Sequence, residues 1–248
     1  MITSRKNPKV KDWIKLKTKK ERERRQLFLL EGYHLIEEAM RAQENITEII
    51  GTKMALEHFS LTRQDIPTHL VSEAISQDMA DTEKTQGIFA VVRSNPQLQK
   101  SHRKALLLDQ VQDPGNLGTM IRSADAAGFD LVAMGKGTVD AYNQKVLRSA
   151  QGSHFHLDLA NVDLRDFIPK LQEQGLVVYG TDLSAESVPY KDLKARDKIA
   201  VLVGNEGQGM NSDLLDLVDQ NTHIPIKGQA ESLNVAIAAS ILMFHFSE

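Results

Sequence analysis

The sequence contains no cysteine among its 248 residues. Disulfide bonds and thiolate metal sites are therefore excluded, and a reducing compartment fits this composition. The uncharged run near the C-terminus, 235–244, is shorter than the roughly 20 apolar residues that a membrane-spanning helix needs. The first residues lead into charges rather than into an apolar segment, so no secretory signal is recognisable. These absences predict a cytoplasmic protein that no segment anchors in a membrane.

Charges nearly cancel over the whole chain but are unevenly placed. The net charge is −3, and hydrophobic residues make up 41% of the chain, which excludes wholesale disorder. Residues 1–31 contain 11 Lys or Arg and 4 Asp or Glu, a balance of +7, so the remainder carries −10. A basic end predicts contact with nucleic acid or a membrane, although a solvated helix face has the same composition.

The first 95 residues alternate between short apolar strands and helices. A basic helix is predicted to begin at Asn7 and Pro8, which offer a cap and a first-turn proline. Trp13 lies on its apolar stripe, and packing in a core is favoured over stacking on a base. Strands are predicted at 27–30, 46–50 and 87–92, and further helices at 35–40 and 73–79. This alternation predicts a small α/β domain over residues 1–95.

A polar, proline-marked linker at 93–104 separates this domain from a second one at 105–248. Strands of the second domain are predicted at 105–108, 131–134, 155–159, 176–180, 199–203 and 223–226. Helices are predicted at 119–127, 144–151, 164–174, 212–218 and 233–246, the last capped by Ser232 or Glu231. The order predicts an open, mostly parallel sheet with helices on both faces, which binds ligands beyond the carboxyl ends of its strands.

Three loops that follow predicted strands are rich in glycine and polar side chains. They cover 109–118, 204–210 and 224–235, and the helix after the first loop carries Arg122. Each loop alone could be a tight turn. Together they indicate a ligand site, because glycine allows close backbone approach and the polar side chains converge. The second loop has GxxGxG spacing, which is not the GxGxxG of a dinucleotide fingerprint.

The residues of these loops also resemble a known family. Residues 113–118 (DPGNLG) with Arg122, 203–210 (VGNEGQGM) and 224–235 (IPIKGQAESLNV) are similar to the three ordered motifs of the SpoU/TrmH family. Its members are S-adenosylmethionine-dependent RNA ribose 2′-O-methyltransferases of the SPOUT superfamily. The stretch 28–39 resembles the small RNA-binding domain that precedes the catalytic domain in many members. Ala236 departs from the pattern, because many relatives carry a serine there.

The resemblance implies a C-terminal trefoil knot that holds S-adenosylmethionine, and a homodimer with the site near the subunit interface. Physical rules alone argue against a knot. The resemblance assigns the cofactor to Gly204, Ile224 and Leu233, with Val203 and Pro225 as walls. No metal is expected. The RNA implied is ribosomal rather than transfer RNA.

The resemblance also places Arg122, Asn116, Glu206, Ser232 and Asn234 in the catalytic centre. A charged guanidinium has no acceptor atom, so Arg122 cannot take the hydroxyl proton. We expect it to grip the phosphate beside the target ribose, while phosphate or water accepts the proton. Glu206 is expected to order Arg122 or its own loop, Asn116 to contact the ribose, and Ser232 and Asn234 to fix the third loop.

The basic end of the chain supplies charge for the RNA phosphates. The candidate residues are Arg5, Lys6, Lys9, Lys19, Lys20, Arg24 and Arg25. Four alternatives remain at this point: a tRNA methyltransferase, a non-catalytic RNA-binding or ribosome-assembly protein, a dehydrogenase, and a zinc site at His154 and His156. The dehydrogenase lacks its fingerprint, and the zinc site lacks further ligands at a suitable spacing.

Overall fold

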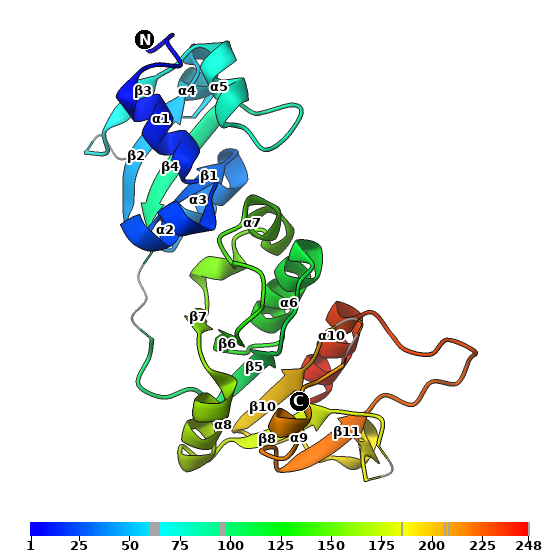
Figure 1. Ribbon diagram of the computed structural model, residues 1–248. Coiled ribbons are helices and arrows are strands. Elements are labelled where there is room, and N and C mark those ends of the chain that lie inside the picture. The colour runs from blue at the N-terminus through cyan, green and yellow to red at the C-terminus, as the bar shows by residue number, and fades with distance from the viewer. Residues whose placement is uncertain (60–64, 95–97, 185, 206, 208, 248) are drawn as a thin grey trace. The chain divides into compact units, whose positions relative to one another are not determined.

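The computed structural model (Figure 1) describes residues 1–59, 65–94, 98–184, 186–205, 207 and 209–247. The chain divides into two compact units: Met1–Asn95 with Tyr142–Phe155, and Pro96–Ala141 with His156–Glu248. The sequence analysis placed residues 142–155 in the C-terminal domain, whereas they pack with the first unit. Each unit has its own hydrophobic core.

The first unit contains a four-stranded sheet in the order β1-β4-β2-β3. Strand β4 runs antiparallel to both of its neighbours, and β2 and β3 are parallel. Side chains alternate between the two faces of the sheet, so Leu29 and Phe89 face one hydrophobic cluster while Phe28 and Leu30 face another. The strand bounds are β1 Leu27–Glu31, β2 Ile46–Gly51, β3 Thr68–Leu70 and β4 Ile88–Arg93.

Helices cover both faces of this sheet. The predicted single basic helix is two helices, because the first ends at a cap on Leu16 and a second begins after Thr18. The buried Arg22 guanidinium donates to the Leu16 carbonyl at 2.8 Å and closes this corner. Trp13 is 3% exposed, which confirms its core role. The bounds are α1 Pro8–Lys15, α2 Lys19–Arg25, α3 Tyr33–Arg41, α4 Lys53–His58, α5 Glu73–Met79, α7 Gln144–Ala150 and the 3₁₀ turn η1 Ser153–Phe155.

The second unit contains a seven-stranded sheet in the order β7-β6-β5-β10-β8-β11-β9. Every neighbouring pair is parallel, which confirms the predicted α/β class. Two strands are displaced from their predicted bounds. The strand predicted at 155–159 begins only at Asp158, and the strand predicted at 223–226 ends at His223, so 224–226 belong to a loop. The bounds are β5 Lys104–Leu108, β6 Leu131–Met134, β7 Asp158–Asn161, β8 Val177–Thr181, β9 Val188–Pro189, β10 Ile199–Val203 and β11 Gln220–His223.

Helices lie on both faces of the parallel sheet (Figure 1). Helix α8 packs its apolar stripe against β5, β8 and β10 in one hydrophobic cluster. Helix α10 contacts α6 and β10. No helix in the described part of the chain is long and apolar enough to cross a membrane. The bounds are α6 Pro114–Ala126, α8 Leu164–Glu173, α9 Ser212–Leu215, α10 Val235–His245 and the 3₁₀ turn η2 Tyr190–Asp192.

Candidate functional site

A pocket of about 500 Å³ lies at the carboxyl ends of β8, β10 and β11 in the second unit. Pockets that bind small molecules span roughly 300–1,000 Å³, so this one can hold a nucleoside-sized ligand. Four predicted cofactor residues line it, namely Val203, Gly204, Ile224 and Leu233. Pro225 is not among the described residues that line it. The second and third predicted loops therefore meet at one pocket.

The second loop closes on itself directly after β10. Asn205 and Gly209 exchange two backbone hydrogen bonds, of 2.9 Å and 3.2 Å. The Asn205 side chain donates to the Gln110 carbonyl at 2.8 Å and accepts from the Gly207 N–H at 2.9 Å. A Cβ at Gly204 would lie 2.6 Å from the backbone of Gly209, so this position requires glycine. Asn205 was not a predicted site residue, although its N-x-G spacing is a turn signal.

The predicted Glu206 lies outside the described residues, as does Gln208. A second residue that sequence reasoning missed is Asp109, which is buried at the end of β5. Its carboxylate accepts from the Asn211 N–H at 3.0 Å, just beyond the same loop. The Asn205 side chain thus holds the start of the second loop, and the Asp109 carboxylate holds the chain just beyond its end.

Helix α6 begins at Pro114, five residues before the predicted start at Thr119. Asp113 caps it by accepting from the Asn116 N–H at 2.8 Å. Asp-Pro is a helix-start signal that the prediction from apolar periodicity overlooked. Asn116 therefore lies in the first turn, and Arg122 lies beyond the second rather than near the helix start.

Arg122 is exposed, and its side chain forms no hydrogen bond or ion pair with any other residue that the structure describes. It is also not among the described residues that line the pocket. The structure therefore does not bring Arg122 into contact with the predicted cofactor residues of this chain.

Asn234 and Asn116 are brought together although 118 positions separate them in the sequence. The Asn234 amide donates to Asn116 Oδ1 at 3.0 Å, while its own Oδ1 accepts from the Ala236 and Ile237 N–H groups. The cap of α10 is thus Asn234, not the predicted Ser232 or Glu231. Both neighbours of Asn234 line the pocket, as does Ser232, so this asparagine pair lies beside the pocket.

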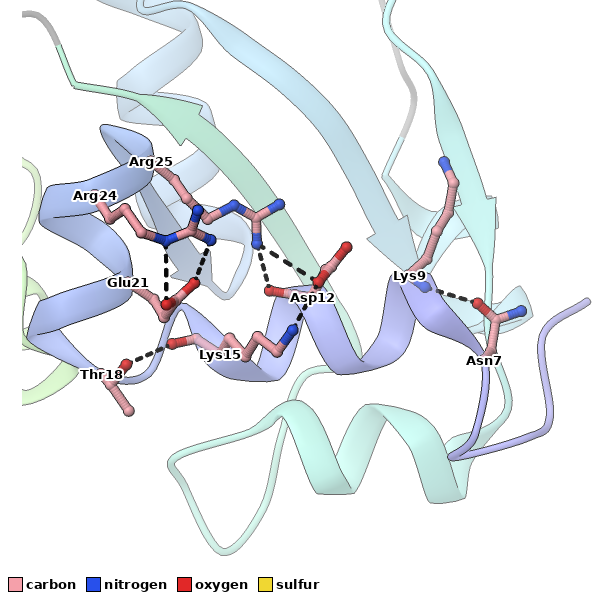
Figure 2. Close-up of polar contacts among 8 residues, drawn as sticks. All are labelled: Asn7, Lys9, Asp12, Lys15, Thr18, Glu21, Arg24 and Arg25. Atoms are coloured by element: carbon pink, nitrogen blue, oxygen red, sulfur yellow. Dashed lines mark hydrogen bonds and ion pairs between the residues drawn. The ribbon is translucent and has the colours of Figure 1, made fainter.

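The basic segment of the first unit is largely engaged in ion pairs (Figure 2). Arg24 binds Glu21 at 2.7 Å, and this hydrogen bond lowers the pKa of Glu21. Arg25 donates to the Asp12 carbonyl at 3.1 Å, and Lys15 contacts the Asp12 carboxylate at 3.3 Å. These charges therefore also stabilise the α1–α2 corner.

The other predicted RNA-binding residues fall into two groups. Arg5, Lys9 and Lys19 contact carboxylates of Asp78, Glu48 and Glu23, at 2.5 Å, 3.5 Å and 3.7 Å. Lys6 and Lys20 are exposed and form no ion pair with a described residue. Exposed ion pairs contribute about 0–1 kcal/mol, so an RNA phosphate can displace the carboxylates of the first group.

The two histidines of the zinc alternative belong to different units. His154 lies in η1 of the first unit and is buried, whereas His156 belongs to the second unit. His156 Nδ1 contacts Asp125 at 2.9 Å. Among the described residues, no group of three or more His, Cys, Asp or Glu could hold a metal ion.

Comparisons with known proteins match both units. The family described as "SpoU rRNA Methylase family" matches residues 103–244, and the "MRM3-like substrate binding domain" matches residues 7–90. The 23S rRNA (guanosine(2553)-2′-O)-methyltransferase RlmP of Bacillus subtilis is 47% identical to this chain over 244 residues. The matched region covers 98% of each of the two proteins.

Two solved structures share the whole fold. An AdoMet-bound rRNA methyltransferase from Sinorhizobium meliloti superposes with a TM-score of 0.88 at 29% identity, covering 98% of this chain and 95% of that one. The SpoU methyltransferase AviRb from Streptomyces viridochromogenes, in complex with AdoMet, gives a TM-score of 0.86 at 25% identity, covering 98% and 97%.

Proposed function

The chain belongs to the SpoU rRNA methylase family, and we propose that it transfers a methyl group from S-adenosylmethionine to a ribose 2′-hydroxyl of ribosomal RNA. The observation that carries this proposal is the pocket beyond β8, β10 and β11, where the second and third sequence motifs meet. Two relatives of the same fold are described with this cofactor bound.

The pocket fits S-adenosylmethionine in size and chemistry. Val203, Ile224 and Leu233 provide apolar surface for an adenine, and the backbone around Gly204 provides donors and acceptors. Pro225, next to Ile224, supports this wall in the proposal. The cofactor supplies an electrophilic methyl group on a sulfonium, so the protein must mainly align and activate a weak nucleophile.

The chain's own polar groups would perform that activation. Asn116 and Asn234 form a fixed pair beside the pocket and are proposed to orient the acceptor ribose. Ser232 lines the pocket and is proposed to fix the third loop. Arg122 would hold the phosphate next to this ribose and stabilise the developing alkoxide. Glu206 stays a prediction, because it lies outside the described residues.

A homodimer forms part of the proposal. Helix α10 has an exposed apolar stripe at i, i+4 and i+7, in which Ile237 is 53% and Phe244 is 50% exposed and Ile241 is half-buried. Exposed apolar side chains in a row favour a protein interface. A second copy would cover this stripe and could bring the exposed Arg122 to a pocket.

The proposal also includes the trefoil knot, the cytoplasmic location and separate roles for the two predicted domains. Strand β10 lies between β5 and β8, and α10 contacts both α6 and β10, which supports a C-terminal segment threaded as in SPOUT proteins. We infer that residues 105–248 carry the chemistry and that residues 1–95 bind RNA. The family match over residues 7–90 supports this role of the first unit.

The proposed substrate is 23S ribosomal RNA, and the first position to examine is the equivalent of guanosine 2553, for which the Bacillus relative is named. Total RNA from cells with and without the gene would be mapped for 2′-O-methyl groups, and purified protein would be supplied with labelled S-adenosylmethionine. We expect one ribosomal methylation to disappear with the gene. Loss of a tRNA methylation instead would select the tRNA alternative, and no loss with no cofactor binding would select the non-catalytic one.

A further inference from the structure

A carboxylate outside the three sequence motifs lines the cofactor pocket. Asp182 directly follows β8, the strand that lies between β10 and β11 in the sheet. Its N–H donates to the Thr222 carbonyl at 3.1 Å, which fixes its backbone to β11. Gly204 follows β10 and Ile224 follows β11, and all three residues line the pocket. Asp182 therefore enters from the middle strand of the pocket.

The carboxylate of Asp182 is prepared to accept hydrogen bonds. The Ser184 hydroxyl and the N–H groups of Ser184 and Leu183 lower the pKa of Asp182, so it is ionised at neutral pH. The Ser184 N–H lies 3.1 Å from Oδ2. No cationic side chain of the described residues forms an ion pair with Asp182. A carboxylate has about four acceptor sites, so donors from a ligand can still be accommodated.

We propose that Asp182 accepts hydrogen bonds from the ribose hydroxyls of S-adenosylmethionine and so selects an intact ribose. This inference rests on the proposed methyltransferase function. Ribose is the central part of the cofactor, between adenine and methionine, and Asp182 belongs to the central strand of the pocket. An acidic side chain at a strand end holds a ribose diol in the dinucleotide-binding folds for the same chemical reason.

Three ligands distinguish this contact from one to the ammonium or the sulfonium, and a dideoxy ribose distinguishes it from one to the adenine amino group, which all three ligands share. S-adenosylmethionine has the diol, an ammonium and a sulfonium; S-adenosylhomocysteine lacks the sulfonium; methylthioadenosine lacks both the sulfonium and the ammonium and keeps the diol. Their dissociation constants would be measured by calorimetry for the native protein and for Asp182→Asn. Hydrogen bonds to charged groups are strong enough that we expect all three to weaken together by roughly ten- to a hundredfold.

The control is Asp197→Asn, which makes the same charge change at a side chain that is 94% exposed and does not line the pocket. We expect it to bind all three ligands like the native protein. Weakening of the first two ligands alone would assign Asp182 to the ammonium, and weakening of S-adenosylmethionine alone would assign it to the sulfonium. Either result, or no change in any ligand, would overturn the inference.

A second measurement needs no variant, in case Asp182→Asn fails to fold. The native protein should bind the 2′,3′-dideoxy analogue of methylthioadenosine at least tenfold more weakly than methylthioadenosine itself. Equal binding of the two would also overturn the inference. If the native protein binds none of the adenosine ligands, the proposed function fails. If it binds them, but equally well with and without the ribose hydroxyls, only the role of Asp182 fails.

Discussion

Replacing Gly204 by alanine tests the pocket at its tightest point. The new Cβ would lie 2.6 Å from the carbonyl carbon and oxygen of Gly209 and 2.7 Å from the Met210 nitrogen. Carbon atoms in contact prefer about 3.5–4.0 Å, so the loop would have to move by roughly 1 Å. The atoms in the way are backbone atoms, and no side-chain rotation can relieve the collision.

This movement would break or lengthen the two Asn205–Gly209 hydrogen bonds, which hold the loop closed. A net loss of about 0.5–1.5 kcal/mol for each gives a destabilisation of roughly 1–3 kcal/mol, which agrees with the usual cost of overpacking. We expect Gly204→Ala to unfold at a lower temperature and to lose most of its affinity for S-adenosylmethionine. Thermal unfolding and calorimetry measure the two effects.

The matched control is Gly228→Ala in the third loop. A Cβ at Gly228 would have nothing within 4 Å, and its backbone is outside the left-handed region. We expect this variant to melt and bind like the native protein. If Gly204→Ala behaves like Gly228→Ala in both assays, the close approach of Gly209 does not constrain the pocket, and the reasoning is refuted.

Three further substitutions test the rest of the site. Arg122→Ala should abolish methylation and leave cofactor affinity and thermal stability unchanged; near-normal turnover would contradict its assignment. Asn234→Ala removes a helix cap and the bond to Asn116, so it should lower the free energy of unfolding by about 1–2 kcal/mol and reduce kcat, which unfolding and steady-state assays check. Lys6→Gln with Lys20→Gln should reduce the slope of log affinity for RNA against log salt by about 0.7–0.9 per lost phosphate contact, and an unchanged slope would remove these lysines from the RNA surface.

The buried strands of the second unit were predictable from sequence because both of their faces are covered. Strands at 131–134 and 199–203 have the predicted bounds, and both are continuous apolar runs. Strand β3 and helix α4 were missed, since both are short and carry polar or charged positions. A local sequence pattern identifies a helix or strand well only where burial restricts its positions to apolar residues.

The position of residues 142–155 depends on contacts that no local pattern contains. Tyr142 stacks on Phe28 with ring centroids 4.5 Å apart, and Leu147 is fully buried in the core of the first unit. The Gln144 amide donates to the Leu29 carbonyl at 2.7 Å. These partners are more than a hundred positions away in the sequence. A boundary drawn from composition at 93–104 therefore could not reveal that this segment packs with the first unit.

The parts of the candidate site that lie in glycine-rich loops were predictable from the sequence. Gly204 and the loops around it stand out in the sequence, and four of the five predicted cofactor residues line one pocket. Asp182, which directly follows β8, and His223, the last residue of β11, line the same pocket, but neither belongs to a glycine-rich loop. Their role depends on the order of the strands in the sheet, which places β8 between β10 and β11.

Gly204 and Arg122 should therefore respond to substitution in opposite ways. Gly204 is enclosed by backbone, so altering it disturbs the loop, the cofactor pocket and stability together. Arg122 is exposed and unpaired among the described residues, so its removal leaves no buried charge behind and should cost the free protein little. Arg122 lies on the helix whose first turn bonds to the pocket loop, and the contact proposed for it is with an RNA phosphate rather than with another part of the described chain. A fall in stability on Arg122→Ala as large as that on Gly204→Ala would therefore argue for a structural arginine and against a catalytic one.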